Sequence, residues 1–150
     1  MNKEELKLVE EVVGKLFSAL EIDGTFSIEE DGEIINVLME TKDTGLVIGY
    51  HGEALESLQL ILSLAIAKKL GSFRRVSIEV DGYKKNRVEY LEKLAQQMKE
   101  KALEENQEQV LNDLRSWERR VVHMILQDDD AVVSESEGRG RERVLVIKPK

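Results

Sequence analysis

Hydrophobic residues in the first part of the chain recur at two different spacings. Between residues 3 and 20 they recur every three or four positions, which predicts an amphipathic helix. Two segments of alternating polar and apolar residues follow, Thr25–Glu29 and Glu33–Glu40. Asp31-Gly32 between them predicts a hairpin with a type I′ turn, because Asp-Gly favours the two positive φ angles that this turn needs.

A second helix and a third strand are predicted next. A glycine-rich segment precedes Glu53–Lys69, where apolar residues again have helical spacing. Leu60 and Leu64 widen the apolar face of this helix, so we expect it to be covered on more than one side. Phe73–Val80 alternates and predicts a strand. The order of elements predicts an α+β domain, a three-stranded sheet with helices on one face.

The pattern divides the chain into two predicted domains, residues 1–82 and residues 83–150. The second begins with a helical pattern over roughly 84–104 and contains a second helix for which Ser116 is a plausible N-cap. Its other predicted elements are a strand at Gln109–Leu114, the helix Trp117–Gln127, and strands at Val132–Ser134 and Val144–Lys148. This arrangement predicts a small second α+β domain.

Composition excludes several function classes. The 150 residues include no cysteine, which excludes a disulfide framework, a cysteine zinc site and a thiol nucleophile. The longest nearly uninterrupted apolar run, Leu58–Ala67, contains Gln59 and Ser63 and is too short to span a bilayer, and the first residues do not resemble a signal peptide. We therefore expect a cytoplasmic protein without membrane insertion. Asp128-Asp129-Asp130 are consecutive and lack further ligands, so we expect no metal and no cofactor.

The charge is distributed unevenly along the chain. The net charge is −8, but residues 68–101 carry 10 basic and 5 acidic side chains, a net of +5. Residues 1–67 carry 4 basic and 14 acidic side chains, a net of −10. Because local field rather than total charge steers a polyanion, the acidic total does not exclude a nucleic-acid partner.

The glycine-rich segment contains the first candidate site. Gly49-Tyr50-His51-Gly52 is a GxxG motif that follows Ile48 and precedes the long helix. Glycines allow the backbone to approach a phosphodiester closely, and the amides at a helix N-terminus attract its oxygens. KH domains hold about four nucleotides in this way. We predict that Ile48, Gly49, Tyr50, His51 and Gly52 bind nucleic acid; the alternative is a tight turn between helices that needs positive φ.

Basic side chains supply the other candidates. Arg119 and His123 are four residues apart on one helix face, with Arg120 beside His123 and with Trp117, Val121, Met124 and Ile125 expected in the core. The alternative for this face is an ordinary solvated one. Lys84, Lys85 and Arg87 begin a helix, where they oppose its dipole. Arg139, Arg141 and Arg143 lie in a Gly-Arg-rich turn, where they either extend a nucleic-acid surface or keep a sheet edge soluble. Lys68, Lys69, Arg74 and Arg75 are expected to flank the groove of the first domain.

These motifs together resemble a known family. Gly45–Gly52 and the helix-first order resemble a type II KH domain, while Glu118–His123 and Ser134–Gly138 resemble an R-three-H domain, named for an Arg and a His separated by three residues. The two in this order resemble the Jag family of bacterial RNA-binding proteins over nearly the whole chain. The resemblance implies binding of single-stranded RNA, with single-stranded DNA as an open alternative, a complex with a small single-KH protein, and a link to cell-envelope growth.

Two departures from the family pattern affect which functions of the family can be inferred for this chain. Family loops usually have basic residues between the last two glycines, whereas this loop has Tyr50 and His51. These supply little positive charge near pH 7, although Tyr50 offers a ring for base stacking. We also expect no counterpart of the N-terminal domain of longer relatives within these 150 residues, so functions that depend on it are not carried over.

Three functional hypotheses follow. The leading one is a non-catalytic protein that binds single-stranded RNA and acts as an RNA chaperone or post-transcriptional regulator. The second is a protein–protein adaptor with a degenerate KH loop, which the acidic first half favours. The third is a phosphate-processing enzyme that uses Arg119 and His123.

Overall fold

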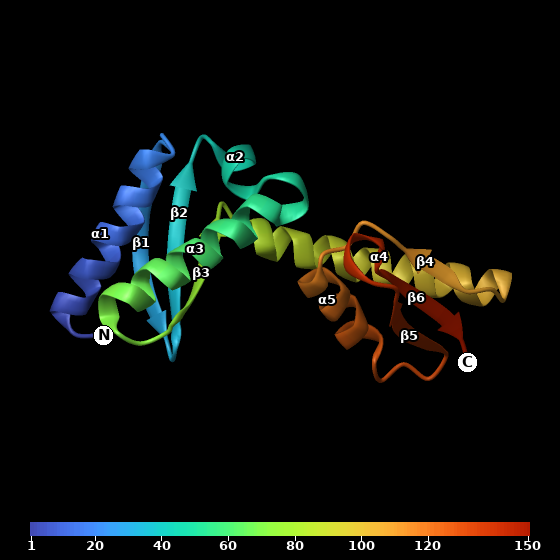
Figure 1. The fold of residues 1–150 in the computed structure, drawn as a ribbon. Helices are drawn as coiled ribbons and strands as arrows, with labels where there is room; N and C mark the ends of the chain where they lie inside the picture. The colour runs from blue at the N-terminus through green and yellow to red at the C-terminus, as the bar shows by residue number, and fades with distance from the viewer. The chain divides into compact units, whose positions relative to one another are not determined.

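The structure is a computed structural model that describes residues 1–150. The chain forms two compact units, Met1–Tyr83 and Lys84–Lys150, each with its own sheet (Figure 1). The first unit contains α1 (Lys3–Ala19), β1 (Gly24–Asp31), β2 (Ile34–Thr41), α2 (Thr44–Ile48), the short 3₁₀ turn η1 (Tyr50–Gly52), α3 (Glu53–Leu70) and β3 (Arg75–Val80). The next elements are α4 (Tyr83–Glu105), β4 (Gln109–Leu111), α5 (Ser116–Leu126), β5 (Val132–Glu137), η2 (Gly140–Glu142) and β6 (Val144–Pro149).

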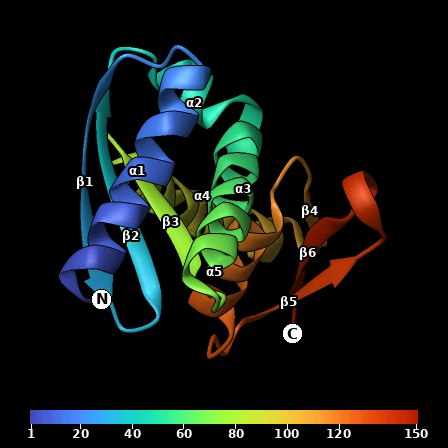
Figure 2. The same ribbon diagram turned by 60° about the vertical axis from the view of Figure 1, so that its left-hand side comes forward.

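The first unit is the predicted three-stranded sheet with helices on one face. Its strand order is β1-β2-β3, with β1 antiparallel and β3 parallel to β2. The parallel pair needs a crossover connection, which α2 and α3 provide. Figure 2 shows α1 and α3 side by side over one face of this sheet, and their apolar residues bury Ile35, Val37 and Ile78 there. The α+β prediction is confirmed for this unit.

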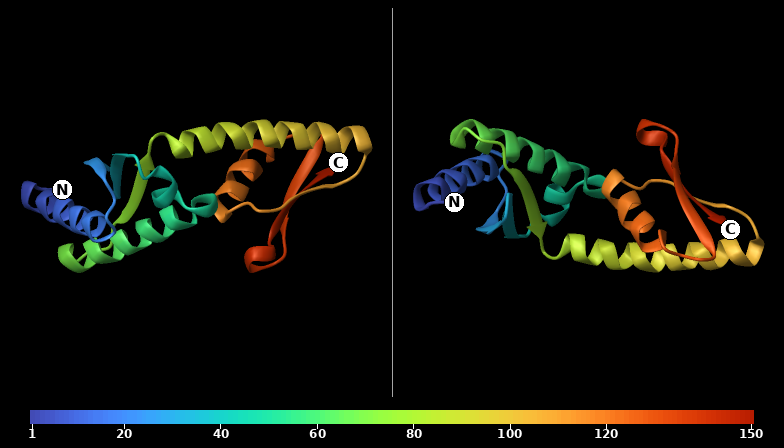
Figure 3. Two further views of the ribbon diagram at one scale, coloured as in Figure 1. Left: turned by 90° about the horizontal axis from the view of Figure 1, so that it is seen from above. Right: turned by 90° about the horizontal axis from the view of Figure 1, so that it is seen from below.

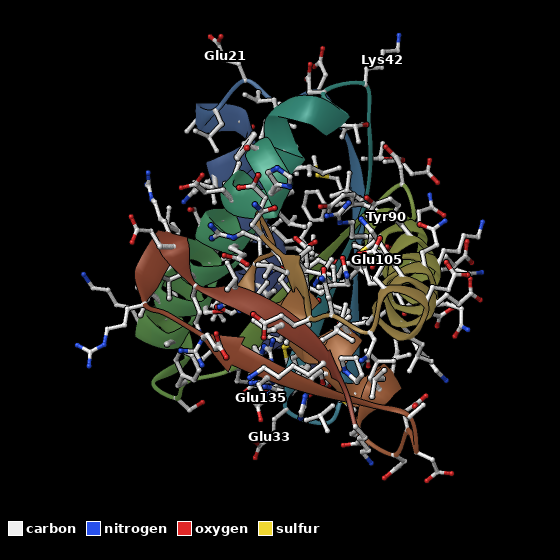
Figure 4. All side chains as sticks on the ribbon, turned by 90° about the vertical axis from the view of Figure 1, so that its right-hand side faces the viewer. Glu21, Glu33, Lys42, Tyr90, Glu105 and Glu135 are labelled. Atoms are coloured by element: carbon white, nitrogen blue, oxygen red, sulfur yellow. The ribbon has the colours of Figure 1, made fainter.

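The β1–β2 hairpin differs from the prediction by one residue. Asp31 pairs with Ile34, so the two loop residues are Gly32 and Glu33 rather than Asp31 and Gly32. Of these two loop residues only Gly32 has a positive φ, +60°. This is the pattern of a type II′ turn, in which the first central residue is glycine. Glu33 lies at the tip of this hairpin and points outward (Figure 4). The predicted type I′ turn was therefore wrong, although the hairpin itself is confirmed.

Helix α3 buries one face and leaves another open. Leu55, Leu62 and Ile66 pack into the core of the first unit. By contrast Leu60 and Leu64 are 59% and 56% exposed, and the neighbouring Ile61 is 49% exposed. The expectation that α3 is covered on more than one side was wrong, and the helix instead presents an exposed apolar face.

The second unit places two helices against a small antiparallel sheet. Its strand order is β4-β6-β5, with β6 in the middle. Figure 3 shows α5 and the sheet on the same side of α4. Leu91 and Ala95 of α4, Val122 of α5, and Leu145 and Ile147 of β6 share one core. The predicted strand at Gln109–Leu114 is shorter in the structure, and the one at Val132–Ser134 is longer.

Helix α5 turns a different face to the core from the one predicted. Glu118, Val122 and Leu126 are buried, whereas Met124 and Ile125, which were expected in the core, are exposed. Trp117 and Val121 are partly buried against the same core. The N-cap is Arg115 rather than Ser116, and no side chain caps the helix. The prediction missed this face because a buried carboxylate occupies a position that hydrophobic spacing assigns to the surface.

Candidate nucleic-acid interface

The two glycines of the GxxG loop have conformations that favour glycine. Gly49 has φ 69° and Gly52 has φ 80°. A Cβ on Gly49 would lie 2.5 Å from the Cβ of Ala54, closer than two carbons can approach. The Oγ1 of Thr44 donates to Oδ2 of Asp81 at 2.8 Å and so ties the start of α2 to the end of β3. The glycines are thus required by the turn itself, whatever the loop binds.

The loop presents an aromatic surface rather than positive charge. Tyr50 is 71% exposed, and its ring meets that of His51 edge-on with centroids 4.1 Å apart. No Lys or Arg occurs between residues 44 and 52. Glu53 and Glu56 lie in the first turn of α3, where they place negative charge beside the backbone amides that a phosphate would approach. Ile48, the fifth predicted loop residue, is partly buried at the end of α2.

The basic residues at the start of α4 have different environments. Lys85 is exposed, and Lys84 is half-buried. Arg87 contacts Glu118, with its Nε 2.8 Å and its Nη2 2.6 Å from Oε2 of that carboxylate. It also lies over the ring of Tyr90, 4.6 Å from the centroid, and Tyr90 is itself exposed. The charge of Arg87 is therefore largely compensated within the second unit.

Arg119 lies among other arginines. Its Nη1 donates to the carbonyl of Leu114 at 2.6 Å, and its Nη2 donates to Oγ of Ser116 at 3.2 Å. Burial, and after it the positive charges of Arg143 and Arg115, lower the pKa of Arg119 below its ordinary value. The charges of Arg143 and Arg115 thus act on Arg119, with the carboxylate of Glu118 acting in the opposite direction, and we call Arg115, Arg119 and Arg143 the arginine cluster.

The arginine cluster contains residues that spacing alone did not join to Arg119. Arg143 was assigned only to the Gly-Arg-rich turn, and Arg115 was not considered. Arg143 is held by a bond from its Nη1 to the carbonyl of Gly138 at 2.9 Å. Arg143 follows Arg119 by 24 positions, and the hairpin between β5 and β6 brings them together. No local motif signals the effect of Arg143 on Arg119.

The other signature residue is also held in place. His123 is exposed on α5, but its Nδ1 lies 2.7 Å from Oγ of Ser134, a buried residue of β5. Arg120 is exposed on the same helix. Arg139 and Arg141 are exposed at the tip of the β5–β6 hairpin. Arg120, His123, Arg139 and Arg141 are thus each exposed on the second unit.

Basic residues at the end of α3 lie far from the GxxG loop. Lys68 and Lys69 lie in the last turn of α3, about 23 Å along the helix from Glu53 at 1.5 Å per residue. Arg74 contacts the Glu30 carboxylate at 2.6 Å and the carbonyl of Gly32 at 2.7 Å. The position of these residues and Arg75 beside the groove of the first domain stays a prediction.

The acidic run after α5 has a structural environment. Oδ2 of Asp129 lies 2.5 Å from the Nζ of Lys99, and Oδ1 accepts from the amides of Ala131 and Val132. The Lys99 bond, followed by the bond from Ala131, holds the pKa of Asp129 below its ordinary value. No group of three His, Cys, Asp or Glu side chains in residues 1–150 is arranged to hold a metal ion. No helix combines the length and apolar character needed to cross a membrane.

Comparison with known proteins assigns a domain to each unit. Residues 6–80 match the model described as "KhpA/KhpB, KH domain", and residues 89–149 match the R-three-H domain. A protein named RNA-binding protein KhpB from Clostridium symbiosum is 32% identical over 142 residues, which cover 93% of this chain and 64% of that relative. A protein of the same name from Streptococcus pneumoniae serotype 2 is 30% identical over 135 residues, or 90% of this chain and 41% of the relative. The chain thus spans less than two thirds of the length of these relatives.

Proposed function

Since the chain belongs to the KhpA/KhpB KH-domain family and also carries an R-three-H domain, we propose that it is a non-catalytic protein that binds single-stranded RNA. Relatives at 30–32% identity bear the name RNA-binding protein, which supports the proposal. The observation that carries it is the arginine cluster on the R-three-H unit, where the charges of Arg143 and Arg115 act on Arg119. An anion bound among them relieves their mutual repulsion, and RNA phosphate matches the forked geometry of arginine.

The two units contribute differently to the proposed complex. The arginine cluster, with Arg120 and His123, supplies charged contacts to the RNA backbone. The GxxG loop supplies the exposed ring of Tyr50, on which an unpaired base stacks, and little charge. Lys84, Lys85, Arg139 and Arg141 extend the basic surface, while Arg87 has most of its charge compensated by Glu118. Binding is therefore electrostatic mainly through the R-three-H unit.

The test is a salt titration of RNA binding. Fluorescence anisotropy follows an RNA of mixed sequence and about 20 nucleotides, several times the roughly four-nucleotide KH footprint. Arg119→Ala and Arg143→Ala should each weaken binding and reduce the slope of log affinity against log salt by about 0.7 for each phosphate that is no longer neutralised. Leu103→Ala, which truncates an exposed apolar residue of α4, is the matched control and should leave the slope unchanged.

Either of two results contradicts the proposal. Binding that is absent even at low salt removes direct RNA binding for this chain. Binding that keeps its salt slope in both arginine variants moves the phosphate contacts away from the arginine cluster. The same titration with single-stranded DNA as competitor measures the preference for RNA, and an RNA strand-annealing assay tests the proposed chaperone role.

A second proposed function is docking of a small single-KH protein. The exposed apolar face of α3 supports it, because Leu60, Ile61 and Leu64 are each about half exposed on one helix. Adjacent exposed apolar residues of this size are typical of protein interfaces. The family description pairs KhpA with KhpB, which supports a related KH domain as the occupant.

This docking is tested with a purified single-KH protein of the same family. Light scattering after size exclusion should detect a complex with the unmodified chain, and Ile61→Glu should abolish it. Val110→Glu replaces an apolar residue of β4 that is 51% exposed, and it should leave the complex intact. Absence of the complex in both variants, or its persistence in both, contradicts this surface.

A further inference from the structure

The buried hydroxyl of Ser134 stands where an apolar side chain would otherwise fit. In β5 the buried positions are Val132 and Ser134, which alternate with less buried neighbours, and Ser134 is only 6% exposed. Burying a hydroxyl costs free energy unless it forms a hydrogen bond. Its Oγ has such a partner in Nδ1 of His123, at 2.7 Å. The polar atom in this strand is thus directed at the histidine ring of the R-three-H signature.

A serine hydroxyl suits both protonation states of the imidazole. Nδ1 is the only partner of the buried Oγ, so in the neutral ring the hydroxyl proton has an acceptor only if Nδ1 carries no proton, which places the ring proton on Nε2. When the ring is protonated, Nδ1–H donates to the hydroxyl oxygen, and Nε2 again carries a proton. In both states Nε2–H is a donor on an exposed side chain, four residues along α5 from Arg119.

We infer that Ser134 is a positioning residue, which fixes the ring of His123 so that Nε2–H donates to an RNA phosphate oxygen beside the arginine cluster. The inference rests on the proposed RNA binding and adds to it the atom that makes the contact and the residue that orients it. Without Ser134 the ring can rotate, and the neutral form can carry its proton on Nδ1. The donor toward RNA is then present only part of the time.

The experiment compares Ser134→Ala with the rescuing variant Ser134→Thr. Ser134→Ala should weaken RNA binding by about five-fold, the effect of one hydrogen bond, and Ser134→Thr should restore most of it. In the background of His123→Ala, removing the Ser134 hydroxyl should cause no further loss, because the two act as a unit. Fluorescence of Trp117, the only tryptophan, verifies that each variant is folded.

A spectroscopic readout separates positioning from a purely structural role. The chain has two histidines, so ¹⁵N chemical shifts of the ring nitrogens are assigned with His123→Ala alone. The Nε2–H tautomer should dominate in the unmodified chain and in Ser134→Thr, and a mixture should appear in Ser134→Ala.

Three outcomes overturn the inference. The first is an unchanged tautomer and affinity in Ser134→Ala, and the second is a further loss in the His123→Ala background. The third is the absence of RNA binding by the unmodified chain. If the tautomer still depends on Ser134 in that case, the proposed function has failed but the positioning of the ring stands.

Discussion

Replacement of Arg87 by methionine tests how the second unit tolerates its buried carboxylate. The side chain of Glu118 has no exposed surface, and Arg87 contacts it through two nitrogens at 2.6 and 2.8 Å. Oε1 of Glu118 is buried without a hydrogen-bond partner, so Arg87 is the main compensation for its charge. Methionine preserves much of the volume of the arginine stem and removes only the cation and its donors.

The expected loss in the free energy of unfolding follows from the cost of an uncompensated buried charge. Removing one partner of a buried ion pair destabilises a protein by about 3–5 kcal/mol. At roughly 0.1 kcal/mol per residue, the 67 residues of Lys84–Lys150 have a free energy of unfolding of about 7 kcal/mol. Arg87→Met should therefore remove about half of the stability of this unit. Arg87→Met with Glu118→Leu should recover most of it, since a well-packed apolar pair often replaces a buried ion pair without loss.

Urea unfolding followed by Trp117 fluorescence measures this effect. Trp117 is the only tryptophan and packs against the core of the second unit, so its emission reports on that unit. Lys85→Met removes an exposed cation from the same helix and should change the free energy of unfolding by less than about 0.5 kcal/mol. A loss below about 1 kcal/mol in Arg87→Met, or a double variant no more stable than the single one, would refute the reasoning.

Three further predictions concern other positions. In Asp129→Asn the urea midpoint of unfolding should fall less as the pH is lowered. The Lys99 bond lowers the folded-state pKa of Asp129, so the stabilising effect of this carboxylate is lost as the pH falls through that value. Gly49→Ala should destabilise the first unit by more than about 1 kcal/mol in thermal unfolding followed by circular dichroism, because φ is 69° and the new Cβ meets Ala54. Tyr50→Ala should weaken RNA binding by about ten-fold with an unchanged salt slope, because a stacking contact carries no charge.

Each of these predictions has a control. An equal acid response in Asp129→Asn and the unmodified chain would contradict the first. Gly45→Ala, where a Cβ has nothing within 4 Å, should be tolerated, and an equal loss at Gly49 and Gly45 would contradict the second. Tyr50→Phe keeps the ring and should keep the affinity; a reduced salt slope in Tyr50→Ala would contradict the third.

Long elements with regular spacing were predictable from the sequence. Helices α1, α3 and α4 span 17, 18 and 23 residues, enough for the apolar repeat to be recognised over several turns. Helix α2 has five residues, which is too short for a period, and it was missed as a helix. The hairpin was found from Asp31-Gly32, but its register was not, because a one-residue shift leaves the same turn residues near the tip.

Contacts between distant residues were not predictable. Glu118 pairs with Arg87, 31 positions earlier in the sequence, and no local pattern signals that pair. A hydrophobic pattern treats every carboxylate as exposed, so it assigned Met124 and Ile125 to the core. The same limitation applies to Leu60 and Leu64, whose apolar character marks a face that is exposed in this chain.

The position of β6 has a consequence for how the protein is made. β6 follows β4 and β5 along the chain and leaves the ribosome after them, yet it lies between these two strands and pairs with both. The first sheet, in contrast, is complete once β3 ends at Val80. During synthesis the first unit can therefore fold early. β4 and β5 have no partner strand until β6 is made, and their unpaired edges can bind other chains. Aggregation therefore competes most strongly with folding while the second unit is still incomplete. A chaperone bound to β4 and β5 during that time would protect the chain until β6, which ends at Pro149, has emerged.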